Sequence, residues 1–102
     1  MESYTHMKRN KSVKILGQEY KVKWTKKPLQ DQFGKPLLGY CDPVKRLIVV
    51  HESGDKRDTE ICYYHECVHG ILFVSGLAQI ISPDVQEIIC ENFAHFIYDL
   101  KK

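Results

Sequence analysis

The residues with the most evident chemistry are His65-Glu66-Cys67-Val68-His69, an H-E-x-x-H motif. The two histidines are four residues apart, so on a helix both imidazoles project from one face, one turn apart. This spacing lets two ring nitrogens bind one zinc ion at about 2.0–2.1 Å. Glu66 lies about 100° further round the helix, where its carboxylate can reach a water molecule on the metal. The motif therefore predicts a catalytic Zn²⁺ site with His65 and His69 as ligands and Glu66 as the general base.

A catalytic zinc site needs a third protein ligand and leaves its fourth position open. The segment Glu87-Ile88-Ile89-Cys90-Glu91 offers two carboxylates four residues apart, which share one face of a second helix. We expect one carboxylate to bind the metal and the other to orient a ligand imidazole through a hydrogen bond. The prediction is Glu87 as the third ligand and Glu91 as the orienting group, with Glu91 as the alternative ligand.

A closed site is the main alternative at the metal. Cys62 precedes His65 by about one turn and lies on nearly the same helix face. Cys62, His65, His69 and Glu87 together would form a structural zinc site with no position left for a substrate. The state of the fourth position discriminates between a structural and a catalytic metal.

Two further side chains continue the face that carries Glu87 and Glu91. His95 and Tyr98 lie one and two turns further along the second helix, and either can donate a hydrogen bond to a tetrahedral oxyanion. A histidine or tyrosine at the edge of a helix is more often simply half-buried, so both are candidates of lower rank than Glu66.

The first half of the chain has strand patterns. Residues 13–16 and 20–24 flank Gly17 and predict a hairpin, because the second run alternates apolar and basic side chains. Residues 26–39 contain two prolines and two glycines and predict a loop. Residues 46–50 predict a third strand, whereas the polar residues 1–11 predict a flexible tail.

The second half has helix patterns. The H-E-x-x-H helix is expected to begin at Asp58 or Thr59 and to end at Gly76. Ser82 and Pro83 are typical of the N-cap and first residue of a second helix. The order of elements predicts an α+β fold: a small antiparallel-type sheet of about three strands, the H-E-x-x-H helix and a C-terminal ligand helix, with both helices on one side. The expected apolar face of the second helix comprises Val85, Ile88, Ile89, Phe93, Phe96, Ile97 and Leu100.

Length and charge limit the classes of protein to consider. The chain has 102 residues and a formal net charge of +2, which predicts one domain over residues 12–102 and no nucleic-acid partner. Apolar runs of about four residues, as at 71–74, are too short to span a membrane, which needs about 20. The first twelve residues lack the apolar segment of a secretory signal, so we expect a cytoplasmic protein with four reduced cysteines.

The two helix motifs together resemble the gluzincin class of zinc metallopeptidases. The segments ICYYHECVHGILFVSGL and EIICENFAHFIYDL are similar to small phage- or prophage-encoded metallopeptidases related to the ImmA/IrrE type. The preceding GYCDPVKRLIVV is similar to the hairpin before the H-E-x-x-H helix of such proteins. One departure is Glu91, which stands where Asn or Asp is frequent, with Asn92 as its neighbour. The resemblance implies a zincin-like fold and an endopeptidase that cleaves a protein, such as a phage or host regulator, inside a bacterial host.

The prediction is a zinc metallopeptidase whose protein or peptide substrate lies extended along the edge of the sheet. The alternative is a non-proteolytic, zinc-stabilised module of a phage or prophage that binds or regulates a partner. A DNA-binding regulator is poorly supported, because the chain lacks helix-turn-helix spacing and has little net positive charge. No sequence feature specifies the oligomeric state.

Overall fold

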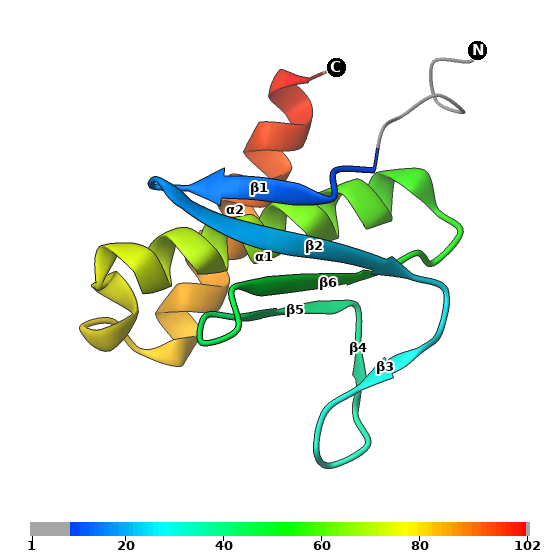
Figure 1. Cartoon of the computed structure of the whole chain (residues 1–102), viewed down its shortest axis with the longest axis horizontal. Helices are drawn as coiled ribbons and strands as arrows, with labels where there is room; N and C mark the ends of the chain where they lie inside the picture. The colour runs from blue at the N-terminus through cyan, green and yellow to red at the C-terminus, as the bar shows by residue number, and fades with distance from the viewer. Residues whose placement is uncertain (1–8, 102) are drawn as a thin grey trace.

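A mixed sheet of four strands forms one side of the molecule in the computed structural model, which describes residues 9–101 (Figure 1). The strand order is β1-β2-β6-β5, so β5 is an edge strand. The pairs β1–β2 and β5–β6 are antiparallel, whereas β2 and β6 are parallel. A separate two-stranded hairpin, β3–β4, projects from the connection between β2 and β5. The strands are β1 (Ser12–Ile15), β2 (Gln18–Thr25), β3 (Leu29–Gln30), β4 (Pro36–Leu37), β5 (Gly39–Asp42) and β6 (Leu47–His51).

The predicted α+β class is confirmed, and the three predicted strands overlap β1, β2 and β6. The sheet differs from the prediction in its number of strands and in the parallel pairing of β2 with β6. The sequence did not predict strand β5. Its four residues lie between two turn signals and are too few to show an alternation of apolar and polar side chains. The predicted loop at 26–39 also contains β3 and β4, which are only two residues each.

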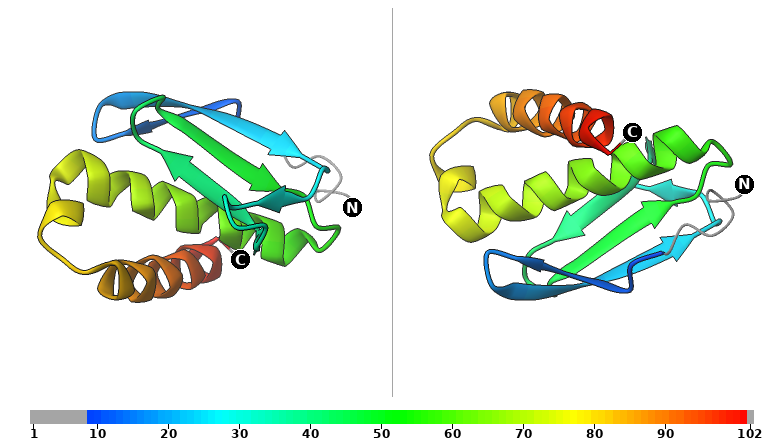
Figure 2. Two further views of the ribbon diagram at one scale, coloured as in Figure 1. Left: turned by 90° about the horizontal axis from the view of Figure 1, so that it is seen from below. Right: turned by 90° about the horizontal axis from the view of Figure 1, so that it is seen from above.

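Two helices are stacked on the same side of the sheet, as predicted. Helix α1 (Lys56–Ser75) packs on the sheet, and helix α2 (Pro83–Leu100) packs on the opposite side of α1 (Figure 2). A short 3₁₀ helix, η1 (Leu77–Gln79), joins them. The layers are therefore sheet, α1 and α2 in that order, with buried residues in both interfaces. The first interface buries Ile15, Tyr20, Val22, Ile48, Val50, Cys62 and Tyr63; the second buries Val68, Leu72 and Cys90.

Helix α1 begins earlier than predicted. Its N-cap is Asp55, whose side chain accepts a hydrogen bond from the backbone N–H of Asp58 at 2.9 Å. The predicted caps, Asp58 and Thr59, therefore lie within the first turn. The preceding Gly54 has φ +95°, a left-handed conformation that reverses the chain just before the cap. Asp55, which follows the glycine turn, was thus a better N-cap candidate than Asp58 or Thr59.

The other predicted helix boundaries are confirmed. Gly76 ends α1 with φ 89°, the left-handed conformation typical of a helix C-terminus. Ser82 caps α2 by accepting a hydrogen bond from the backbone N–H of Val85 at 3.2 Å, and Pro83 is the first helical residue.

The predicted apolar face of α2 is largely wrong. The face that packs on α1 is centred on Cys90 and Ala94, both fully buried, with Ile89 and Ile97 partly buried beside them. Small side chains at this contact let the two helices approach closely. The remaining predicted residues, which are exposed, are Val85, Ile88, Phe93, Phe96 and Leu100.

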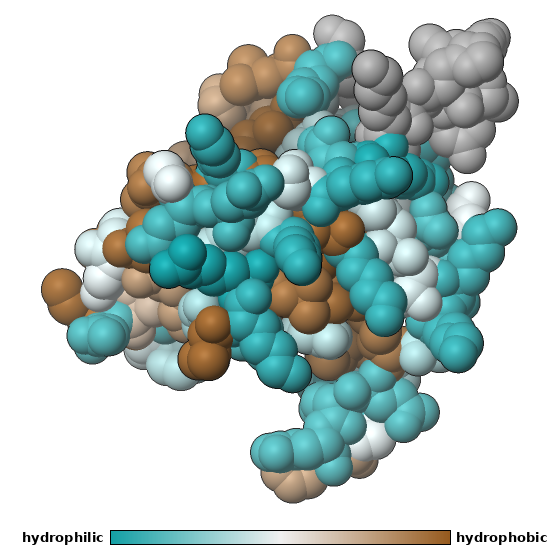
Figure 3. All heavy atoms as spheres, viewed as in Figure 1, coloured by the Kyte–Doolittle hydropathy of each residue, from teal (hydrophilic) through white to brown (hydrophobic). Residues whose placement is uncertain are grey.

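Residues 1–8 of the predicted tail lie outside the described residues. Residues 9–11 contact the sheet and α1: Arg9 pairs with Glu52 at 2.8 Å, and the carbonyl oxygen of Asn10 accepts a hydrogen bond from Trp24 Nε1 at 2.7 Å. The outward face of the sheet is predominantly hydrophilic (Figure 3), as expected from the exposed Lys21 and Lys23 on β2. Neither described helix is long and apolar enough to cross a membrane.

Candidate metal centre

The H-E-x-x-H residues lie in an open cleft of about 650 Å³ between the edge strand β5 and the two helices. The motif is in the middle of α1, so both histidines are held by a helix whose ends are capped on either side. Four acidic residues line the cleft among the described residues, and no lysine or arginine does. An environment with this charge favours a bound cation over an anion.

Glu87 on α2 reaches both histidines of α1. Its Oε1 lies 3.2 Å from His65 Nε2, and its Oε2 lies 2.8 Å from His69 Nε2. The two imidazole rings are 5.0 Å apart between centroids and face the same space. Two imidazole nitrogens and one carboxylate therefore converge, which is a donor set that fits Zn²⁺ and leaves a fourth position open.

Glu91 contacts the other side of the His65 ring. Its Oε1 lies 3.0 Å from His65 Nδ1, the nitrogen that does not face Glu87. A carboxylate in this place holds the imidazole in one orientation and keeps Nε2 free to bind a metal. The structure thus brings together the four residues that the sequence placed in the metal centre, and the two carboxylates contact different nitrogens of His65.

Glu66 lines the cleft beside the histidines and is only 7% exposed. Burial, and secondarily the charge of Glu87, raise the pKa of its carboxyl group to about 8. Burial lowers the pKa of His69, against the opposing influence of Glu87, and so favours the neutral imidazole that binds a metal.

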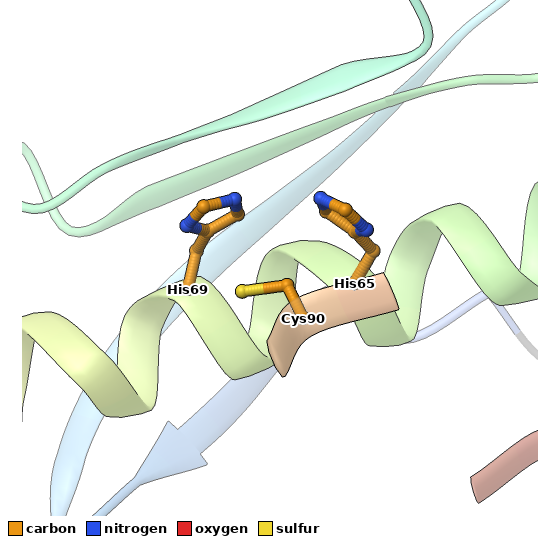
Figure 4. Close-up of side chains that lie close together, drawn as sticks. All are labelled: His65, His69 and Cys90. Carbon is orange, nitrogen blue, oxygen red and sulfur yellow. The ribbon is translucent and has the colours of Figure 1, made fainter. Parts of the chain in front are cut away.

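Sequence reasoning missed Cys90 as a neighbour of the histidines. Its Sγ and one nitrogen each of His65 and His69 lie within 4.8 Å of one another, which makes these three residues a possible metal-binding group (Figure 4). Cys90 is fully buried, and burial raises the pKa of its thiol to about 12. The sequence feature that could have identified Cys90 is its position three residues after Glu87, about one turn further along the same helix. Glu87 is the other candidate for the third position, because its carboxylate oxygens lie 3.2 and 2.8 Å from the two Nε2 atoms.

Cys62 points toward β5. Its Sγ donates a hydrogen bond to the carbonyl oxygen of Leu38 at 3.2 Å. A Cβ added to Gly39 would lie 2.8 Å from the same sulfur, so Cys62 packs directly beneath the edge strand. Among the described residues, the cysteine grouped with the two histidines is Cys90 and not Cys62.

The two candidate oxyanion donors occupy different places. His95 lines the cleft, and its Nδ1 lies 2.9 Å from the backbone oxygen of Glu91, which leaves Nε2 for another partner. Tyr98 is not among the described residues that line the cleft, and the guanidinium carbon of Arg57 lies 5.5 Å from the centre of its ring. The position of His95 is therefore the one compatible with contact to a bound substrate.

Comparison of the chain with protein families, curated proteins and solved structures gives no match.

Proposed function

We propose that this chain is a zinc-dependent metallopeptidase whose Zn²⁺ is held by His65, His69 and Glu87. The observation that carries the proposal is the position of Glu87, whose two carboxylate oxygens face the Nε2 atoms of both histidines at 3.2 and 2.8 Å. Three protein ligands at an open cleft are typical of catalytic zinc sites, whereas structural sites have four.

Three further residues of the cleft, Glu66, Glu91 and His95, have distinct tasks in peptide hydrolysis. Zinc, when bound, supplies polarisation of the scissile carbonyl and activation of a water molecule. Glu66 accepts the proton of the attacking water and transfers it to the leaving amine. Glu91 keeps the His65 ring in place, and His95 donates a hydrogen bond to the oxyanion.

The edge strand β5 forms one wall of this cleft, so an extended peptide bound there would add a strand to the sheet. The side chains of Leu38, Tyr40 and Phe73 are exposed along the cleft and favour apolar side chains of a substrate. The resemblance to phage and prophage metallopeptidases adds a protein regulator of phage or host as the substrate. The four unpaired cysteines favour the reducing cytoplasm of a bacterial host as the site of action.

A second candidate function follows from Cys90. If its thiol bound the metal together with His65, His69 and Glu87, the site would be closed and the chain would be a zinc-stabilised binding or regulatory module. Substitution separates the two functions, because Cys90 is dispensable for metal binding only in the peptidase.

The test combines zinc titration with cleavage of a defined library of unstructured peptides, followed by mass spectrometry. The wild-type protein is expected to bind one zinc ion per chain and to cleave peptides. Glu66→Gln should still bind zinc and lose activity by about 10²–10⁴-fold, the usual contribution of a general base. Glu87→Gln should weaken zinc binding, and Cys90→Ser should retain both properties. Loss of zinc in Cys90→Ser as well as in Glu87→Gln would establish the closed site and refute the peptidase.

A further inference from the structure

A stripe of apolar side chains runs along the face of α2 that turns away from α1. Its members are more than two-fifths exposed, from 42% at Val85 to 67% at Leu100. We call this surface the outer stripe, and it consists of Val85, Ile88, Phe93, Phe96 and Leu100.

No layer of the described fold covers the outer stripe. Helix α2 is the last of the three layers, and α1 occupies only the side that carries Cys90 and Ala94 (Figure 2). A continuous apolar surface of this kind on a helix is typical of an interface.

The order of residues along the stripe is compatible with two-fold symmetry. In an antiparallel pair of identical helices, residues equally distant from the midpoint face each other across the axis. With the midpoint between Asn92 and Phe93, Val85 of one copy faces Leu100 of the other. The partly buried Ile89 likewise faces Phe96 of the other copy. These two pairs are apolar on both sides, and at the axis the polar Asn92 of each copy faces Phe93 of the other, where it can fix the register of the pair.

The exposed apolar area of the stripe supplies more than half of what one partner of a standard dimer interface buries. Phe93 and Phe96, each slightly more than half exposed, present about 100 Å² apiece, and with the three aliphatic residues the stripe presents roughly 500 Å². A standard interface buries about 800 Å² per partner, of which an apolar centre of this size is the major part. The remainder would come from polar side chains on either side of the stripe.

From these observations we infer that the chain forms a homodimer in which the outer stripes of two α2 helices pack antiparallel about a two-fold axis. Glu87 and Glu91 contact His65 and His69 and line a shallow hollow together with Ile88 and Asn92, so the cleft borders the outer stripe. This inference is independent of the proposed function, because it does not depend on zinc or on peptide hydrolysis.

Sedimentation equilibrium over a range of concentrations tests the dimer. The wild-type protein should show a monomer–dimer equilibrium, and Phe96→Glu should raise the dimer dissociation constant at least tenfold, since it places two charges in the apolar interface. The matched control is Phe33→Glu, which introduces the same charge at an 83% exposed phenylalanine on the β3–β4 hairpin and should leave the equilibrium unchanged.

Cross-linking tests the antiparallel arrangement and does not depend on whether Phe96→Glu folds. Phe93→Cys, next to the axis, should form an intermolecular disulfide under mild oxidation, and Phe33→Cys should not. A wild-type protein that is monomeric at all concentrations would overturn the inference and point to a different partner for the stripe. A dimer that cross-links equally through Phe33→Cys, or that persists in a folded Phe96→Glu variant, would also refute it.

Discussion

Gly39 allows the edge strand β5 to approach the helix that carries the H-E-x-x-H motif. A Cβ at this position would lie 2.7 Å from the backbone oxygen of Val49 on β6 and 2.8 Å from the buried Sγ of Cys62. It would also lie 3.4 Å from Cγ of Glu66. Two of these contacts are shorter than carbon makes with oxygen or sulfur in folded proteins; one partner is a backbone atom, and the other is a buried sulfur that donates a hydrogen bond to the carbonyl oxygen of Leu38.

We therefore expect Gly39→Ala to destabilise the protein. Two simultaneous overpacked contacts cost about 3 kcal/mol, the upper part of the usual range. Alanine recovers up to about 1 kcal/mol, because it reduces the conformational freedom of the unfolded chain. The net loss in the free energy of unfolding is about 2 kcal/mol, which lowers Tm by roughly 8–16 °C in a domain of this size. Because β5 must move away from Glu66, peptidase activity should fall as well.

Urea denaturation of the metal-free protein, followed by far-ultraviolet circular dichroism, measures this loss. The matched control is Gly70→Ala on α1, where the new Cβ would lie 2.6 Å from Cδ1 of Ile15, the end of a flexible side chain. Alanine also favours a helix by about 1 kcal/mol relative to glycine, so Gly70→Ala should cost less than Gly39→Ala. A Gly39→Ala protein as stable as the wild type, or more stable than Gly70→Ala, would refute the close packing of β5 on α1.

Three further predictions concern titratable groups. In the metal-free protein, the raised pKa of Glu66 means that the folded state binds more protons than the unfolded state between pH 4.5 and about 8. The free energy of unfolding should therefore fall as pH rises through this window, by at most several kcal/mol, and it should fall much less in Glu66→Gln. Urea midpoints that decrease equally with pH in the two proteins would contradict this prediction. Glu91→Ala should weaken zinc binding about 10–100-fold by releasing the His65 ring, as measured with a competing chelator, and unchanged affinity would exclude the orienting role. Burial raises the pKa of every thiol to about 11 or 12, so alkylation by iodoacetamide at pH 8 should be more than a hundredfold slower in the native than in the urea-unfolded protein, and equal rates would show accessible thiolates. The thiols are Cys41, Cys62, Cys67 and Cys90.

Local signals in the sequence were sufficient to predict the elements that carry the site. The spacing of His65 and His69 and the N-cap at Ser82 depend only on helix geometry and neighbouring residues, so a single sequence reveals them. Glu87 and Glu91 were predicted to share a face for the same reason. The structure adds which nitrogen each carboxylate contacts, and this depends on the rotation of α2 against α1.

Non-local packing explains what the sequence did not reveal. Strand β5 exists because its backbone pairs with β6, and four residues between turn signals do not specify that pairing. The buried face of α2 was misassigned because the helix has apolar residues around more than half of its circumference. The choice between those residues depends on which face fits α1, and there the small Cys90 and Ala94 pack better than the larger Phe93 and Phe96.

That choice links the candidate metal centre to the outer stripe. Packing Cys90 and Ala94 against α1 rotates α2 so that Glu87 and Glu91 face the histidines. The same rotation leaves Phe96 and its apolar neighbours on the outside, since side chains on opposite faces of one helix move together. If the large apolar residues were buried instead, the two carboxylates would turn away from His65 and His69 and the donor set would be lost. The exposed apolar stripe is therefore a direct consequence of the packing that turns Glu87 and Glu91 toward the two histidines.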